Sequence, residues 1–163
     1  MKQTVRSNVF ETNSSSIHSL ALCKEPLFEE PVDLKEYTAE IGTDGEFGWG
    51  LEYITDPIAK LKYLYLMAME FKMYRGDSSY LNRLKKKFPK VFFLEPNPKD
   101  EYLEGYIDHA TDKEELFQEM LRDADSFINR GVLILHNDNT DYSASIEKYL
   151  KKHGARIVAR GGN

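Results

Sequence analysis

The sequence is poor in the residues that build disulfide frameworks, zinc sites and membrane spans. It contains one cysteine, Cys23, among 163 residues, which excludes an internal disulfide and any zinc site made from several cysteines. No apolar run approaches the roughly 18 residues that a membrane-spanning helix needs. Residues 1–16 lack the apolar region of a secretory signal. We therefore expect a cytoplasmic protein that does not enter a membrane.

Metal-binding and cofactor-binding motifs are also missing. The four histidines (His18, His109, His136 and His153) show no i, i+3 or i, i+4 pair, so we predict no metal site. The serines at 14–16 lack the Gly-x-Ser-x-Gly context of a hydrolase nucleophile. The glycines form neither a phosphate-binding loop nor a dinucleotide fingerprint. The sequence thus names no cofactor and leaves open whether the protein is an enzyme.

What is present is material for a core. Hydrophobic residues make up 41% of the chain and aromatic residues 12%, with ten Tyr and nine Phe. A chain of this length buries roughly two-thirds of the surface that it exposes when unfolded. We predict a single compact domain over residues 1–163.

Charge alternates along the chain although the net charge is only −5. Ten acids oppose one base between Glu25 and Asp56, whereas nine bases oppose two acids between Lys60 and Lys90. These blocks divide the domain into an acidic irregular segment, 24–56, and a basic helical segment, 57–90. The blocks either neutralise one another across the fold or polarise the surface toward a charged partner.

The first half of the chain predicts strands and then helices. Residues 3–10 and 17–23 are typical of strands joined by a sharp polar turn, and a further short strand is expected at 37–41. Asp56 can cap a helix that has Pro57 at its first position. Gly76 ends that helix, a second helix is expected at 78–88, and the stretch 90–94 is typical of a strand.

The second half predicts a strand–helix–strand unit. Thr111 to Glu114 has the form of a capping box, and it opens a helix that is expected to continue to Phe127. The apolar run 132–136 indicates a strand buried on both faces. A helix at 142–153 and a strand at 156–159 follow. A parallel pair with a right-handed crossover would result, so we expect an α/β or α+β fold with a mixed, partly parallel sheet and a C-terminal β-α-β unit.

The first candidate site is the polar stretch before the strand at 17–23. Asn13, Ser14, Ser15 and Ser16 can orient an oxyanion through hydroxyl and amide groups. His18 titrates near neutral pH and can act as an acid or a base. In the alternative interpretation, the serines and Asn13 satisfy turn backbone groups and His18 is a packing residue.

This stretch is also the basis of a resemblance. The run VFETNSSSIHS at 9–19 resembles the N-terminal signature of an uncharacterised family of bacteriophage and prophage proteins. Residues 46–49, Asp56-Pro57 and 60–65 resemble the middle signature of the family, and residues 137–139 before an amphipathic helix resemble its C-terminal element. The resemblance implies a phage accessory protein in the host cytoplasm. It implies no activity, because none is established for the family.

The second candidate site is the polar loop 136–141, which follows the predicted buried strand and precedes a helix. Ligands of parallel α/β sheets bind at such strand ends. We assign His136 and Asn137 to ligand binding, and Asp138 to catalysis as a base or as the partner of His18. Asp138 and Asp141 would repel a bare phosphate, so they suit a hydroxyl-rich ligand, a cation or the role of a base. Alternatively, Asp141 or Thr140 only caps the helix.

Two further features concern macromolecular partners. The lysines, arginines and tyrosines of residues 60–87 have the composition of a single-strand nucleic-acid surface. The flanking acidic blocks would repel a polyanion, so we do not expect nucleic acid as a partner. Trp49 stands between two glycines and is a candidate anchor for a protein partner. Alternatively, its ring closes the acidic loop from inside.

Two functions follow. In the first, the 13–18 and 136–141 segments meet and bind a small phosphorylated or nucleotide-like ligand, either without chemistry or with His18 and Asp138 as catalytic groups. In the second, the acidic segments and Trp49 bind and inhibit a host or defence protein. The first requires a concave pocket, and the second requires a convex acidic face.

Overall fold

The computed structural model describes residues 16–100, 102–107, 113–137 and 140–162. Its elements follow one another along the chain as β1 (Ser16–Cys23), β2 (Ala39–Ile41), β3 (Glu46–Phe47), β4 (Glu52–Ile54), α2 (Pro57–Arg75), α3 (Ser79–Lys87), β5 (Val91–Phe93), β6 (Tyr106–Ile107), α4 (Lys113–Arg122), α5 (Ala124–Arg130), β7 (Gly131–Asn137), α6 (Ser143–His153) and β8 (Ala155–Gly162). The predicted strand at 3–10 and the capping residue Thr111 lie outside the described residues.

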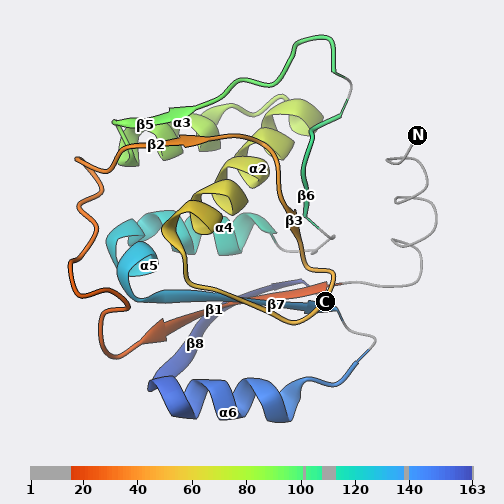
Figure 1. Ribbon diagram of the computed structural model, residues 1–163. Coiled ribbons are helices and arrows are strands. Elements are labelled where there is room, and N and C mark those ends of the chain that lie inside the picture. Colours follow the sequence, from red (N-terminus) through yellow and green to blue (C-terminus); the bar gives the residue numbers. More distant parts are fainter. Residues whose placement is uncertain (1–15, 101, 108–112, 138–139, 163) are drawn as a thin grey trace.

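The main sheet has the order β4-β7-β1-β8 (Figure 1). β1 is antiparallel to both β7 and β8. β7 and β8 therefore run in the same direction, as expected for a strand–helix–strand unit, but β1 lies between them. The predicted parallel strands are thus present with α6 between them in the sequence, but they are not neighbours in the sheet. Parallel pairing occurs instead in two small sheets, β2–β5 and β3–β6, so the α+β class with mixed sheets is confirmed.

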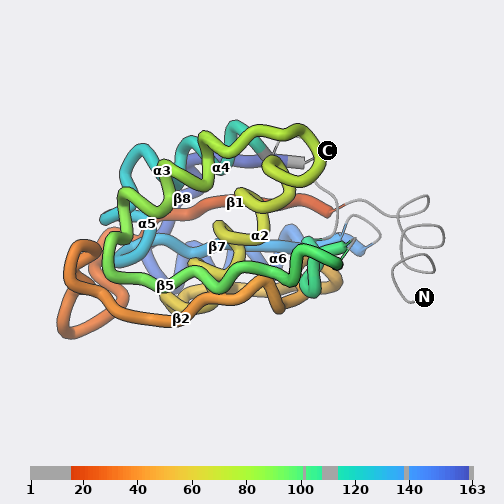
Figure 2. Tube along the Cα trace, turned by 90° about the horizontal axis from the view of Figure 1, so that it is seen from above, coloured from red at the N-terminus to blue at the C-terminus, as the bar shows by residue number. Residues whose placement is uncertain are grey.

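Helices cover both faces of the main sheet. α6 lies on one face, and α2, α4 and α5 lie on the other (Figure 1). β2 and β5 run side by side as an outer layer beyond α2 (Figure 2). This arrangement explains the burial of β7, whose residues from Gly131 to Leu135 are all buried. The sequence prediction of a strand buried on both faces is therefore confirmed.

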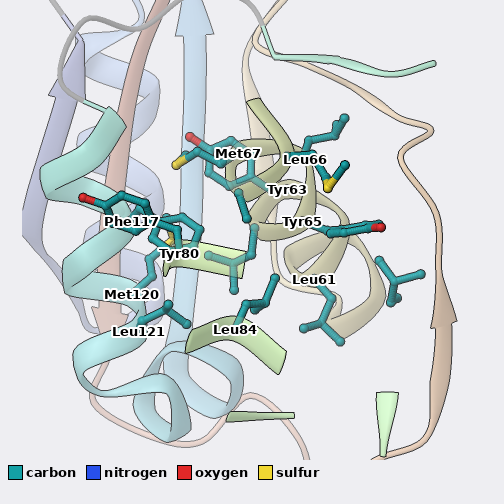
Figure 3. Packing of buried hydrophobic residues seen from close by; sticks show 14 of the residues in the cluster. Leu61, Tyr63, Tyr65, Leu66, Met67, Tyr80, Leu84, Phe117, Met120 and Leu121 are labelled. Atoms are coloured by element: carbon teal, nitrogen blue, oxygen red, sulfur yellow. The ribbon is translucent and has the colours of Figure 1, made fainter. Parts of the chain in front are cut away.

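α2 is the central helix of the core. It packs against α3 and α4 through the ring of Phe71, whose centroid lies 4.6 Å from that of Tyr80 on α3 and 6.0 Å from that of Phe117 on α4. Tyr80 and Phe117 in turn meet edge to face at 5.2 Å between ring centroids (Figure 3). Ten of its residues, from Lys60 to Phe71, are buried. The helix is therefore buried on more than one side. The helical spacing of its apolar residues in the sequence predicts only one buried face.

The ends of α2 are as the sequence predicts. Asp56 accepts a hydrogen bond from the Ala59 backbone N–H at 3.0 Å, and Pro57 occupies the first turn. Gly76 ends the helix in the left-handed conformation, with φ of 66°, which a residue without Cβ adopts freely.

Removing the α2 cap gives a first testable expectation. Asp56→Ala should lower the free energy of unfolding by about 1 kcal/mol, because one backbone donor of the first turn loses its acceptor. Urea denaturation measures the change. Asp100→Ala removes an exposed loop carboxylate and is the matched control. Equal effects of the two substitutions would show that the cap contributes nothing.

One expected helix is divided in two. The chain from Lys113 to Arg130 breaks at Asp123, whose carboxylate accepts from the Ser126 backbone N–H at 3.2 Å. An aspartate competes with the helical backbone for its hydrogen bonds, and here it ends α4 and caps α5. No helix in the described ranges is long and apolar enough to cross a bilayer.

Candidate functional site

The two polar segments singled out in the sequence meet in the sheet. Ser16 lies opposite Asn137, and Ile17 lies opposite His136, in the antiparallel β1–β7 pair. The start of β1 and the end of β7 therefore form one corner of the sheet. Asn13, Ser14, Ser15 and Asp138 lie outside the described residues, so their predicted roles stay predictions.

The pleat of the sheet separates the two histidines. Side chains alternate between faces along a strand, and cross-strand partners share a face. His18 pairs with Leu135 and points toward α2, whereas His136 pairs with Ile17 and points toward α6. The two imidazoles therefore lie on opposite faces of the sheet and cannot form one site.

His18 lies in the core. Its exposed fraction is 0%, its Nδ1 lies 2.5 Å from the Tyr63 hydroxyl, and its Nε2 lies 2.6 Å from Oγ of Ser16. Burial and the nearby Glu70 raise the pKa of Tyr63 well above its ordinary value, so the phenol keeps its proton and can donate it to the ring. The geometry is that of a buried polar chain linking β1 to α2, which fits the packing interpretation of His18.

The face opposite His18 carries a pocket. A cavity of about 510 Å³ lies between the main sheet and the first turns of α6. Its lining comes from three strands, the loop after β7 and α6: Ile17, Ser19, His136, Thr140, Asp141, Tyr142, Ser143, Ile146, Glu147, Leu150, Ile157 and Arg160. It combines an apolar floor with hydroxyl groups and charges of both signs, a composition typical of small-molecule sites.

Ser19 is the most unusual group of this pocket. Its side chain is 3% exposed, and its hydroxyl has no hydrogen-bond partner among the described residues. A buried hydroxyl without a partner is rare, because it loses its bonds to water and regains none. Arg160 lies directly opposite on β8, is exposed, and forms no ion pair within the described ranges.

His136 is the imidazole that the pocket contains. Its Nδ1 lies 2.9 Å from the backbone oxygen of Asn137. A carbonyl oxygen only accepts, so Nδ1 carries the proton and Nε2 of the neutral ring is an acceptor. The ring packs edge-on against Tyr142, with 5.6 Å between centroids. This contact places the imidazole beside the N-terminus of α6.

The two carboxylates of the pocket differ in their roles. Asp141 accepts from the Ser143 backbone N–H at 2.9 Å and from its hydroxyl at 2.5 Å, and these bonds lower the pKa of Asp141. Asp141 thus organises the entry into α6, as the capping interpretation holds. Glu147, one turn further on, is exposed and has no partner among the described residues.

Asn137 and Trp49 are joined by a hydrogen bond and do not line the pocket. The Asn137 side-chain amide donates to the backbone oxygen of Trp49 at 2.9 Å. The Trp49 ring is half-buried and stacks on Tyr106, with 5.5 Å between centroids. These contacts close the loop before β4 from inside. They fit the second interpretation of Trp49 rather than a prominent anchor on a convex face.

Two pocket residues were missed as site residues in the sequence. Ser19 shares a face with Ile17 by strand alternation, and that pattern could have separated it from His18. Arg160 is one of five basic residues between Glu147 and Arg160. Only the β1–β8 register brings it opposite Ser19. Within the described residues, no three His, Cys, Asp or Glu side chains gather closely enough to hold a metal ion.

No family model matches the chain, and neither a curated protein nor a solved structure matches it. The chemistry of the pocket must therefore be inferred from its own residues.

Proposed function

We propose that this protein binds a small phosphorylated ligand that also carries hydroxyl groups, of the nucleotide or sugar-phosphate class, in the pocket between the main sheet and α6. The observation that carries the proposal is the Ser19 hydroxyl, buried at the pocket without a described partner. Leaving such a group unsatisfied costs about 1–3 kcal/mol. A ligand oxygen that accepts from Ser19 would recover this free energy.

The charges of the pocket indicate which ligand fits. Arg160 offers a planar guanidinium for a phosphate, and it stands opposite Ser19 in the register. Asp141 and Glu147 would repel a bare phosphate, but they can accept from hydroxyl groups on the rest of the ligand. Ile17, Ile146 and the other apolar lining residues supply contact for a ring.

His136 takes the place that the sequence had assigned to His18. Its Nε2 accepts from a ligand hydroxyl when the ring is neutral, and it donates to a phosphate when the ring is protonated. The resemblance of residues 9–19 to phage and prophage proteins is the basis for placing this binding in the host cytoplasm.

The test is ligand binding to wild type and to matched variants. A panel of nucleoside monophosphates and sugar phosphates is screened by thermal unfolding and then by calorimetry. A ligand at 100 times its Kd stabilises the folded state by about 2.7 kcal/mol, which raises Tm by several degrees. Arg160→Gln should weaken binding about tenfold or more, because it removes a charge-assisted contact.

Two variants separate binding from folding. Ser19→Ala should leave the unliganded protein as stable as wild type or more stable, since it removes an unsatisfied hydroxyl, while it weakens ligand binding. Arg156→Gln makes the same charge change on β8 but on the opposite face, opposite Leu22, and should bind like wild type. If no member of the panel stabilises the wild type, or if Arg156→Gln weakens binding as much as Arg160→Gln, the proposal is wrong.

A further inference from the structure

A second pocket lies away from α6 and has a different character. A cavity of about 520 Å³ is lined by cations from three separate segments of the chain. Arg83, Lys86 and Lys87 come from the end of α3, Lys35 comes from the turn before β2, and Arg122 comes from the junction of α4 and α5. We propose that this basic pocket, defined by these five residues, binds a compact polyanion that carries several phosphate groups.

Among the described residues, the lysines of the basic pocket form no ion pair, whereas the lysines next to them in the sequence do. Lys85 contacts Glu95 at 3.5 Å, and Lys90 contacts Glu36 at 2.6 Å. Lys35, Lys86 and Lys87 form no ion pair within the part of the chain that the structure describes. The protein as a whole is acidic, so unpaired cations around one hollow are not a consequence of excess base.

The two arginines are held in place. The Arg83 guanidinium lies 5.8 Å from the centroid of the Tyr80 ring, and Arg122 contacts Glu119 at 2.5 Å. A cation already fixed by a ring or an ion pair loses less conformational entropy when an anion binds. The pocket therefore combines guanidinium groups that already contact a ring or a carboxylate with ammonium groups that form no ion pair among the described residues.

A purely structural explanation covers only part of this cluster. Cations at the last turn of a helix are stabilised by its dipole, which accounts for Lys86 and Lys87 in the last turn of α3. It applies equally to Arg122 in the last turn of α4, but it does not account for Lys35, which precedes β2, or for the meeting of these three segments. Their convergence on one cavity is a property of the tertiary structure, and it raises the local positive potential.

Two aspartates also line the basic pocket, and both are engaged. Asp123 accepts from the Ser126 backbone N–H at 3.2 Å, and Asp125 accepts from the Asn129 side-chain amide at 3.2 Å. These bonds hold both carboxylates against α5. The cations outnumber them, so the balance of the lining favours an anion with several charges over a single phosphate.

The shape of the site favours a compact ligand. The five cations line one cavity, whereas an extended nucleic-acid backbone needs a groove that follows it. A chain of linked phosphates places several charges within such a hollow. Inorganic tripolyphosphate is therefore the probe of choice, with orthophosphate as the singly phosphorylated comparison.

The experiment is calorimetric titration of the full chain with tripolyphosphate at low and at physiological salt. Wild type should bind, more weakly at the higher salt. The double variant K86Q/K87Q should lose about tenfold in affinity or more, because two charge-assisted contacts disappear. K151Q/K152Q removes two adjacent lysines from the last turn of α6 and should bind like wild type.

The outcomes also separate this site from the α6 pocket. Arg160→Gln should not change tripolyphosphate binding, and K86Q/K87Q should not change binding of the nucleotide or sugar-phosphate panel. The inference is overturned if tripolyphosphate does not bind, or if both double variants weaken it equally. It is also overturned if orthophosphate binds as tightly, or if a single-stranded oligonucleotide binds more tightly through the same lysines.

Discussion

His18→Ala is expected to lower the free energy of unfolding by about 4 kcal/mol, the largest effect of any single change considered for this protein. Two costs add. The missing ring leaves a cavity in a fully buried position, and the Tyr63 hydroxyl, also fully buried, loses its acceptor. For a domain of this size, 1 kcal/mol corresponds to about 2–4 °C in Tm, so thermal and urea unfolding both resolve the change.

Tyr63→Phe provides the graded comparison. It keeps the ring and removes only the hydroxyl, so it should cost about 1–3 kcal/mol, mainly by leaving Nδ1 of His18 without this contact. The double variant should cost less than the sum, since the two side chains share one hydrogen bond. Strict additivity, or a His18→Ala protein as stable as wild type, would contradict the role of His18 as a buried link between β1 and α2.

The same variant distinguishes the two interpretations of His18. If His18 faced a ligand as an acid or base, its substitution would reduce binding or activity with little loss of protein stability. If His18 is a packing residue, its substitution lowers the stability of the protein whether or not a ligand is present. His18→Gln, which keeps a polar group on the same strand face, gives a second measurement if His18→Ala does not fold.

Lys60 carries the second large prediction, a dependence of stability on pH. Its side chain is 0% exposed, and Nζ donates to the backbone oxygens of Phe127 and Ile128 at 3.0 and 2.9 Å. It forms no ion pair with a described residue. Burial is the main reason that the pKa of Lys60 falls from 10.5 to about 7, while Cys23 and Asp56 oppose this change only in part.

The sign of the effect follows from the two pKa values. Between pH 10.5 and about 7, the unfolded chain binds a proton at Lys60 that the folded chain does not. The cost of folding therefore grows as pH falls through this window and becomes constant below the folded pKa. Stability should rise by about 1.5 kcal/mol from pH 7 to pH 8.5. Above this range the raised pKa values of Cys23 and Tyr63 act in the opposite direction.

Lys60→Met isolates this contribution. Urea denaturation of both proteins at pH 7.0, 7.75 and 8.5 gives the slope, and the difference between the slopes removes every other titrating group. The free energy of unfolding of the variant should not show this increase between pH 7 and pH 8.5, because methionine fills the site and binds no proton. Parallel profiles for the two proteins would show that Lys60 keeps its ordinary pKa when folded. Lys62→Met, which removes a partly exposed neighbour paired with Asp44 at 2.8 Å, is the control.

The sequence by itself determined the helices and the buried strand. Asp56, Pro57 and Gly76 act on backbone groups within a few residues of themselves, so their effect on α2 can be predicted without any distant contact. The apolar run of β7 identified its burial for a similar reason, since side-chain composition along one strand reports both faces. The break at Asp123 was missed because an aspartate is compatible with either a helix interior or a cap.

Only the tertiary structure decided the neighbours and the faces. The insertion of β1 between β7 and β8 depends on hydrogen bonds between residues more than 100 positions apart, and no local pattern contains that information. A shift of one residue in this register would exchange the faces of every side chain on β1. The register thus sends His18 into the core beside Tyr63, and it brings Ser19, Arg160 and His136 together at the α6 pocket. The polar composition of residues 13–19 and 136–141 identified where chemistry could occur, while the pairing of the strands selected which side chains share a site.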